Sequence, residues 1–195
     1  MPSSYPLDIE VYAPDHLARW RPLFNWLIVI PADVWASILA FGAVFAVIAG
    51  WFAIVASGEL PESLGNYLMA VLRYQLRVQG YLYGLADRYP AFAVPAGYVD
   101  PGDYQTVVYS ARAIRRDRVS VLFRAVLAIP QLVVLYFVGI VASVVAMLAW
   151  FAVLATGRWP AAMRDFFVGY LRWSTRVAAY LYLVTDLYPP FGMQP

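Results

Sequence analysis

Two long apolar runs dominate the chain, at residues 23–57 and 122–156. Each run is longer than the roughly 20 residues that a helix needs to cross the hydrocarbon core of a bilayer. A proline divides each run, Pro31 in the first and Pro130 in the second. Because proline is tolerated in the first turn of a helix but not in its interior, we predict a short interfacial helix before each proline and a spanning helix after it. The spanning helices should cover 33–57 and 132–156.

A less apolar helix is expected after each spanning helix. Gly58 and Gly157 should end the spanning helices, and the second helices should then run over 61–86 and 160–185. Steps of three and four residues place two arginines of each second helix on one stripe with small and polar residues, while the other faces are aromatic and aliphatic. The stripe consists of Asn66, Ala70, Arg73, Arg77, Gly80, Gly84 and Asp87 in the first repeat, and of Asp165, Gly169, Arg172, Arg176, Ala179, Leu183 and Asp186 in the second.

Short extended segments precede the two apolar runs, at 5–12 and 104–110. In the first segment, Leu7, Ile9 and Val11 alternate with acidic residues, which is typical of a half-buried strand. Because a lone strand is not stable, we expect the two segments to pair with each other at the membrane surface.

The chain contains an internal repeat. Shifting the sequence by 99 residues aligns 19–92 on 118–191 without a gap, and 24 of the 74 paired positions are identical. Arginine, glycine, proline and aspartate recur at this one offset, which indicates a tandem duplication. The sequence therefore predicts an all-α membrane protein: a tandem repeat of two helical hairpins with about four membrane helices, each repeat beginning with a short extended segment. The expected parts are a first membrane repeat at 1–93, a linker at 94–103 and a second membrane repeat at 104–195.

Composition restricts the class of protein. Hydrophobic residues make up 63% of the chain and charged residues 13%, against about 25% charged residues in an ordinary soluble domain. A water-soluble sphere of this size could not hide so much apolar surface, so composition excludes a soluble globular protein, a disordered tail and a nucleic-acid-binding arm. The net charge of +2 is too small to indicate a polyanionic partner. All the cations are arginines, which bind carboxylate or phosphate with two hydrogen bonds.

The sequence carries no recognisable catalytic constellation. It has no cysteine and a single histidine, His16, in a polar stretch, which argues against thiol catalysis, haem and zinc sites. Phosphate-binding, nucleophile-elbow, zinc-protease and dinucleotide motifs are missing. We therefore expect neither an enzyme nor a bound metal or cofactor. The first twenty residues lack the form of a signal peptide, so the membrane segments should direct insertion themselves.

The second helix of each repeat has two interpretations. It lies in the interface as an amphipathic helix, or it spans with its arginine stripe turned inward, at a cost of about 5–7 kcal/mol for two arginines. If both helices of each repeat span, the N-terminus, the linker and the C-terminus share one side, which then gathers seven arginines in keeping with the positive-inside rule. This distribution favours four spans in two parallel repeats, with both termini in the cytoplasm.

The stripe arginines are the candidate functional residues: Arg73, Arg77, Arg172 and Arg176. An ionisable group within a membrane is a functional candidate by default. Because two arginines at i and i+4 repel each other, we expect an anion between them, which is a lipid phosphate, a carboxylate such as Asp165, or an acidic residue of a partner subunit. In the structural alternative, the arginines cap helix carbonyls near Pro31 and Pro130 or reach lipid headgroups.

Four small residues of the stripe are predicted to let helices approach closely. They are Gly80, Gly84, Gly169 and Ala179. We favour packing within the protein as their role.

The second repeat resembles a known family. The features that carry the resemblance are Ile129-Pro130, Trp150-Phe151, Thr156-Gly157-Arg158-Trp159-Pro160, the segment from Phe166 to Gly169, Leu171-Arg172-Trp173, Arg176-Val177, Tyr180 and the segment from Thr185 to Phe191. They are similar to the bacterial membrane family catalogued as domain of unknown function 4389. The first repeat departs from it at Ser57-Gly58-Glu59-Leu60-Pro61, which replaces the basic and aromatic turn. The resemblance implies a bacterial inner-membrane protein, often with tandem copies, and it implies no activity.

We expect a non-enzymatic accessory or scaffold subunit of a larger bacterial membrane complex, crossing the inner (cytoplasmic) membrane several times. Aromatic, small and arginine-bearing surfaces suit packing against lipid and partner helices. The alternative is a transporter or lipid-handling protein with an arginine-lined site for an anion or a lipid phosphate. Membrane lipids and other membrane subunits are the expected partners, nucleic acid is not, and a homo-oligomer is compatible with either function.

Overall fold

The computed structural model of the protein describes residues 5–14, 16–93, 97–110 and 116–194. Helices dominate this part of the chain, as the sequence predicts, and two short strands accompany them. In chain order, the elements are β1 (Leu7–Val11), α1 (Arg21–Ile28), α2 (Ile30–Ser57), α3 (Glu62–Leu82), β2 (Thr106–Ser110), α4 (Arg118–Thr156) and α5 (Ala161–Leu181).

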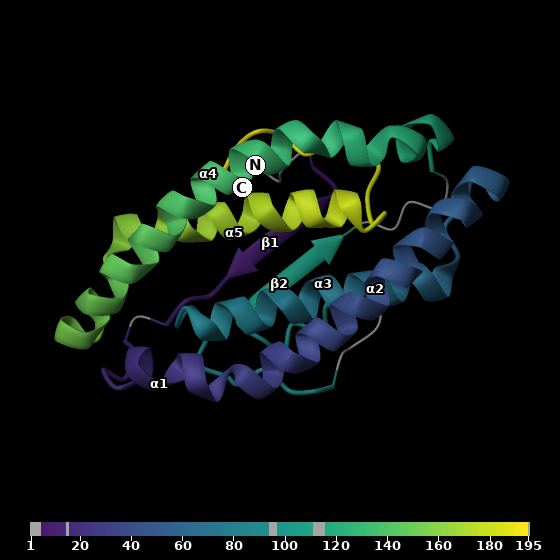
Figure 1. Ribbon diagram of the computed structural model, residues 1–195. Coiled ribbons are helices and arrows are strands. Elements are labelled where there is room, and N and C mark those ends of the chain that lie inside the picture. Colours follow the sequence, from purple (N-terminus) through teal and green to yellow (C-terminus); the bar gives the residue numbers. More distant parts are fainter. Residues whose placement is uncertain (1–4, 15, 94–96, 111–115, 195) are drawn as a thin grey trace.

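The elements form three layers (Figure 1). Helices α2 and α4 contact each other in the first layer, α3 and α5 form the second, and the strands form the third, with β1 against α5 and β2 against α3. One apolar core connects the layers, because each contributes buried side chains to the same cluster. Repeat-related pairs from the three layers are Ala43 and Ala142, Leu72 and Leu171, and Ile9 and Val108.

Both apolar runs form helices long and apolar enough to cross a membrane, judged by length and composition. Gly58 and Gly157 end α2 and α4 in the left-handed conformation, with φ of 80° and 72°, which confirms the predicted helix ends. Glycine suits this position because it has no Cβ to clash there. The second helices, α3 and α5, begin directly after Pro61 and Pro160.

The two repeats differ at their prolines. In the first, Pro31 lies in the first turn of α2 and α1 is a separate helix, as predicted. In the second, the expected break is wrong, because Pro130 lies inside one continuous helix, α4. Side chains on both sides of this proline bond to α5 and the chain beyond it: Arg124 donates to the carbonyl of Tyr180, and Gln131 donates to the carbonyl of Pro189. The bond from Gln131 has no counterpart in the first repeat, where Ala32 occupies the equivalent position.

The predicted pairing of the extended segments is confirmed. Strands β1 and β2 are antiparallel, and Ile9 lies opposite Val108, its own equivalent in the repeat. A twofold axis therefore passes between these residues and relates the two repeats.

Reciprocal contacts follow the same axis. The amide of Leu17 donates to the carbonyl of Gly157, and the amide of Arg116 donates to the carbonyl of Gly58, at 2.8 and 2.9 Å. The indoles of Trp51 and Trp150 likewise donate to carbonyls at the start of the opposite repeat, those of Val121 and Pro22. Each repeat thus covers the end of the long helix of the other.

These contacts correct the expected arrangement of the repeats. The end of α2 meets the residues just before α4, and the end of α4 meets the residues before α1, so α2 and α4 run in opposite directions, as Figure 1 shows. The repeats are therefore antiparallel, not parallel. The parallel arrangement was wrong because it assumed that the whole linker lies at one end of the helices. In the structure α3 ends beside the end of α4, where the carbonyl of Tyr83 accepts from Trp159, and α4 begins at the opposite end, beside Gly58.

Paired cysteines test this strand register. Glu10 lies opposite Val107 in the sheet, and opposed side chains are about 4.5–5.5 Å apart at Cβ. The double substitution Glu10→Cys and Val107→Cys should therefore form a disulfide under mild oxidation. Trypsin cleavage between the strands followed by non-reducing electrophoresis would reveal the joined fragments.

Glu10→Cys with Val108→Cys is the matched control. A shift of one residue places these side chains on opposite faces of the sheet, so no disulfide should form. Equal cross-linking in both variants would contradict the register.

Candidate functional site

The arginines of α3 surround one carboxylate. The Nε of Arg73 lies 2.8 Å from Asp100 Oδ2, and a terminal nitrogen of Arg77 lies 3.3 Å from Asp100 Oδ1. The side chain of Asp100 is 0% exposed and that of Arg73 is 1% exposed. Arg77 also pairs with Asp103, at 3.0 Å. The anion expected between the two arginines is therefore supplied by the protein itself, from the segment that follows α3.

The Asp100 carboxylate also organises its own loop. It accepts hydrogen bonds from the backbone amides of Gly102 and Val108, so each of its oxygens receives donors from the backbone and from α3. The Arg77 guanidinium lies 5.0 Å from the ring centre of Tyr104, and burial raises the pKa of that phenol above its ordinary value. The ring is thus a neutral face under a cation, which is an attractive arrangement. Together these contacts bind the linker and β2 to α3.

The arginines of α5 hold different segments. Arg176 donates to the carbonyl of Gln194 at 2.8 Å and lies 5.7 Å from the ring centre of Tyr5. Burial raises the pKa of Tyr5 to about 12, so its phenol stays neutral and donates to the carbonyl of Leu187. Arg172 donates from Nε to the carbonyl of Ile9 at 3.0 Å. The second arginine pair therefore binds the chain beyond α5 and strand β1.

Arg172 differs from the other three arginines because it is only partly buried. It lines a surface groove of about 680 Å³, together with Arg164, Asp165 and the residues at the end of β1. Asp165, the acid considered for the arginine pair, lies 3.6 Å from Arg164 instead. The structure thus separates the four arginines into three that are buried and one that reaches a groove.

Further buried arginines were missed by sequence reasoning. Arg21 pairs with Asp87 and lies over the ring of Tyr81, while Arg124 pairs with Asp186 and lies over the ring of Tyr180. The aspartates and tyrosines are repeat equivalents, but the arginines are not. Arg124 is the equivalent of Asn25, which donates to the carbonyl of Tyr81 as Arg124 does to that of Tyr180. A tyrosine and an aspartate recur six residues apart in both repeats, and this repeated spacing was the signal in the sequence that could have indicated these sites.

Two small residues of the stripe, Gly80 and Gly169, face segments other than helices. A Cβ at Gly80 would lie 2.7 Å from Thr106 of β2, and a Cβ at Gly169 would lie 2.7 Å from Met193. Ala179 is buried in the central core, and Gly84 lies just after α3 with a left-handed φ of 71°. The small side chains at Gly80 and Gly169 therefore leave room for a strand and for the chain beyond α5.

The chemistry of this arrangement is that of ion pairing and backbone capping. His16, the single histidine, is exposed and bonded to Arg158. In the ranges that the structure describes, no group of three His, Asp or Glu residues is placed to hold a metal ion.

Removing the Asp100 charge tests the role of the first arginine pair. Asp100→Asn should lower the free energy of unfolding by about 3–5 kcal/mol, because two buried guanidiniums lose their shared counter-charge. Asp103→Asn is the matched control; Asp103 is half exposed, so its loss should cost about 1 kcal/mol or less. Denaturant unfolding in detergent micelles measures both. Similar losses in the two variants would show that Asp100 is not the anchor.

Comparisons with known proteins agree with the repeat. No curated protein and no solved structure matches the chain. A family model described as domain of unknown function (DUF4389) matches twice, at residues 19–94 and 118–192. The matched segments cover most of the chain and coincide with the two units that the fold relates by its twofold axis. The chain therefore belongs to the DUF4389 family and carries two tandem copies of its domain.

Proposed function

We propose that the protein is a non-enzymatic accessory or scaffold subunit of the bacterial inner membrane, which lies flat in one leaflet and presents its strand-bearing face to a partner on the water side. The observation that carries this proposal is the separation of apolar and polar exposed surface onto opposite layers of the fold.

The apolar face consists of α1, α2 and α4. Large hydrophobic side chains stay exposed along these helices, among them Trp26, Phe41, Phe45, Phe52, Tyr136, Phe137 and Phe151. Contiguous apolar surface of this extent is not found on soluble monomers and marks contact with lipid or protein. No charged residue occurs in 34–57 or 125–156, so hydrocarbon can surround these stretches without burying a charge.

The opposite face is polar and partly non-helical. It carries the two strands, the segment 97–105, and exposed charged residues that include Arg88 and Asp103. Non-helical backbone exposed to hydrocarbon leaves its N–H and C=O groups unsatisfied, so such segments do not face lipid. If the antiparallel helices α2 and α4 stood upright in the membrane, this face would lie at membrane depth. Lying flat, it meets water.

Charge distribution supports the same orientation. A flat arrangement places the segment before α1, the linker and the residues before α4 on one side of the membrane. Among the described residues it gathers Arg19, Arg21, Arg88, Arg116 and Arg118, five of the seven arginines that the sequence assigns to the cytoplasmic side. Four upright helices in antiparallel repeats could not place these arginines on one side of the membrane.

The scaffold role rests on how the fold uses its arginines. Arg73, Arg77 and Arg176 are buried and bonded to oxygens of this chain, and these bonds hold the linker and chain ends against the helices. The polar face is thereby a defined surface that a second protein can bind.

A second candidate function rests on the groove at Arg172. Two arginines, Arg164 and Arg172, line it, and guanidinium groups suit a phosphate. A lipid headgroup or another anion could bind there, which would make the protein a lipid-handling or transport component.

Labelling of single cysteines tests the flat orientation. Because the natural chain has no cysteine, Glu59→Cys, Asp103→Cys and Arg158→Cys each provide one thiol, at the two ends of the helices and on the polar face. A membrane-impermeant maleimide should label all three from the cytoplasmic side alone, in inside-out and not in right-side-out vesicles.

Two outcomes would contradict that orientation. Labelling of position 103 from the side opposite to 59 and 158 would indicate upright helical hairpins. Labelling of 59 and 158 from opposite sides would indicate that α2 and α4 cross the membrane in opposite directions.

Purification from native membranes in mild detergent tests the scaffold role. Mass spectrometry should find a protein partner in stoichiometric amount, and a charge reversal on the polar face, Arg88→Glu, should reduce its recovery. A preparation that contains only this chain and anionic lipid would instead favour the second candidate.

A further inference from the structure

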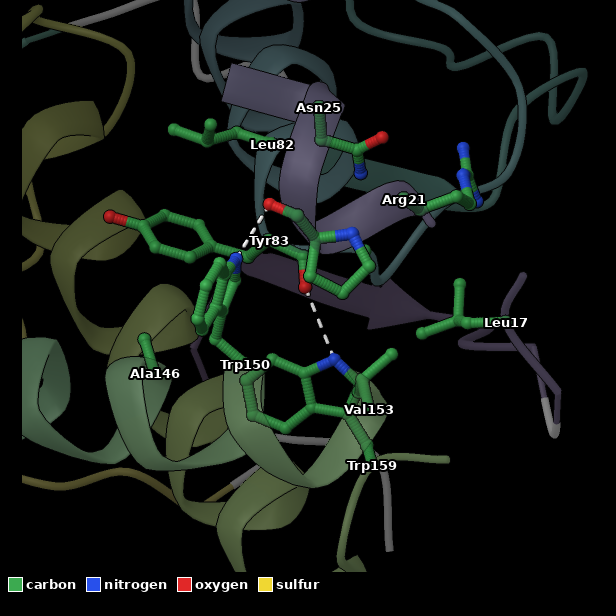
Figure 2. A pocket seen from close by; sticks show the side chains of 11 residues that line it. Leu17, Arg21, Asn25, Leu82, Tyr83, Ala146, Trp150, Val153 and Trp159 are labelled. Atoms are coloured by element: carbon green, nitrogen blue, oxygen red, sulfur yellow. Dashed lines mark hydrogen bonds between the residues drawn. The ribbon is translucent and has the colours of Figure 1, made fainter. Parts of the chain in front are cut away.

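An apolar pocket opens between the two repeats at one end of the molecule (Figure 2). Its walls come from α1 and the residues before it, the end of α3 and the last turns of α4, and its cavity volume is about 60 Å³. Two indoles form part of the wall, and both have their nitrogens satisfied. Trp150 donates to the carbonyl of Pro22 and Trp159 to that of Tyr83.

The twofold axis predicts a second pocket at the other end, but that space is filled. There, Leu183 packs with Ile54, Leu60 and Val121 in a buried cluster. The repeat equivalents of Leu183 and Leu60 at the open end are Gly84 and Trp159. Gly84 contributes no side chain, and the indole of Trp159 turns to the Tyr83 carbonyl. The pocket therefore exists because one repeat lacks the leucine that closes the other.

The backbone at these two positions is nearly the same. Gly84 has a φ of 71° and Leu183 a φ of 61°. A leucine is strained in this left-handed conformation, and Leu183 is nevertheless 1% exposed and fully packed. A Cβ at Gly84 would meet Leu17 at 3.4 Å and Trp159 at 3.8 Å, which are ordinary contacts. The nearest neighbours of Gly84 therefore leave room for a side chain, which would bear the same backbone strain that Leu183 bears. The structural effect of glycine here is to leave the pocket open.

Charge also differs between the two ends. Leu17, a wall residue of the pocket, bonds to Gly157, and the adjoining side chains Arg19 and Arg158 are exposed. At the filled end, the equivalents of these residues are Arg118 and Glu59, so a cation and an anion take the place of two cations. The open end therefore combines an apolar pocket with two exposed cations, Arg19 two residues from the wall residue Leu17 and Arg158 next to the wall residue Trp159.

We propose that this pocket holds part of one acyl chain of an anionic membrane lipid, with the headgroup against Arg19 and Arg158. Exposed apolar side chains follow two of its wall residues in the chain: Leu23 and Phe24 come after Pro22, and Phe151 comes after Trp150. In the proposed orientation these helices lie in hydrocarbon, which brings lipid to the same helices. Apolar lining and a few polar groups at the edge are typical of a site for an amphiphile. This inference rests on the membrane embedding of the proposed function, but neither on its partner nor on the groove at Arg172.

Native mass spectrometry of the delipidated full chain in detergent tests the site, with phosphatidylglycerol and phosphatidylcholine of identical acyl chains as probes. The natural chain should retain one phosphatidylglycerol more tightly than any further lipid. Gly84→Leu copies the filled end and should weaken that binding by at least about tenfold, or 1.4 kcal/mol. Ala146→Leu fills the pocket from the regular helix α4 and should do the same, so the test survives if Gly84→Leu does not fold.

Two further variants distinguish the pocket that holds the acyl chain from the arginines that contact the headgroup. Leu183→Gly leaves the proposed pocket intact and should keep the tight lipid. Arg158→Glu, the residue found at the filled end, should reduce the preference for phosphatidylglycerol over phosphatidylcholine while a lipid remains bound. The proposal would be overturned if the natural chain retained no lipid. It would also be overturned if folded Gly84→Leu and Ala146→Leu retained phosphatidylglycerol as tightly as the natural chain does. Neither result would affect the cysteine labelling or partner tests of the proposed function.

Discussion

An arginine side chain keeps its charge in any protein environment, so each guanidinium placed inside this fold must meet oxygen atoms. Three arginines of the helices α3 and α5, Arg73, Arg77 and Arg176, are buried between an apolar helical layer and a thin layer of strands. In the first repeat the oxygens come from Asp100, in a segment that has no helix of its own. In the second they come from the carbonyls of Ile9 and Gln194. The need to neutralise or solvate these cations explains why irregular chain covers the inner helices.

This constraint also explains how the two repeats depend on each other. Arg172 of the second repeat binds strand β1 of the first, while β2 of the second repeat lies against α3 of the first. The segment before each long helix covers the end of the other long helix. A repeat separated from its partner would expose a helix end, a strand edge and a guanidinium at once. The duplication is therefore one folding unit with two halves.

Local features of the fold could be predicted from the sequence. Gly58 and Gly157 end their helices because the left-handed conformation favours glycine, and Leu7, Ile9 and Val11 alternate as a strand must. The arginine spacing correctly indicated an anion for Arg73 and Arg77. The bonds described for Arg172 and Arg176 go to backbone carbonyls instead. Its source was hidden, because Asp100 lies in a polar linker and comes to Arg73 only through the path of the chain. Pro130 was misjudged for a similar reason, since Gln131 beside it bonds to a carbonyl far along the chain, that of Pro189. The direction of the repeats was also missed, because charge counting cannot distinguish a linker that turns at one end from one that runs along the helices.

The central claim is that the protein lies flat, with α2 and α4 in hydrocarbon and the strand layer in water. Polarised infrared spectroscopy of the protein in aligned bilayers measures this orientation most directly, because the amide I transition of a helix lies close to its axis. The account predicts a dichroism that places the mean helix axis near the membrane plane, since α2, α3, α4 and α5 run alongside one another. A mean axis near the membrane normal would contradict it.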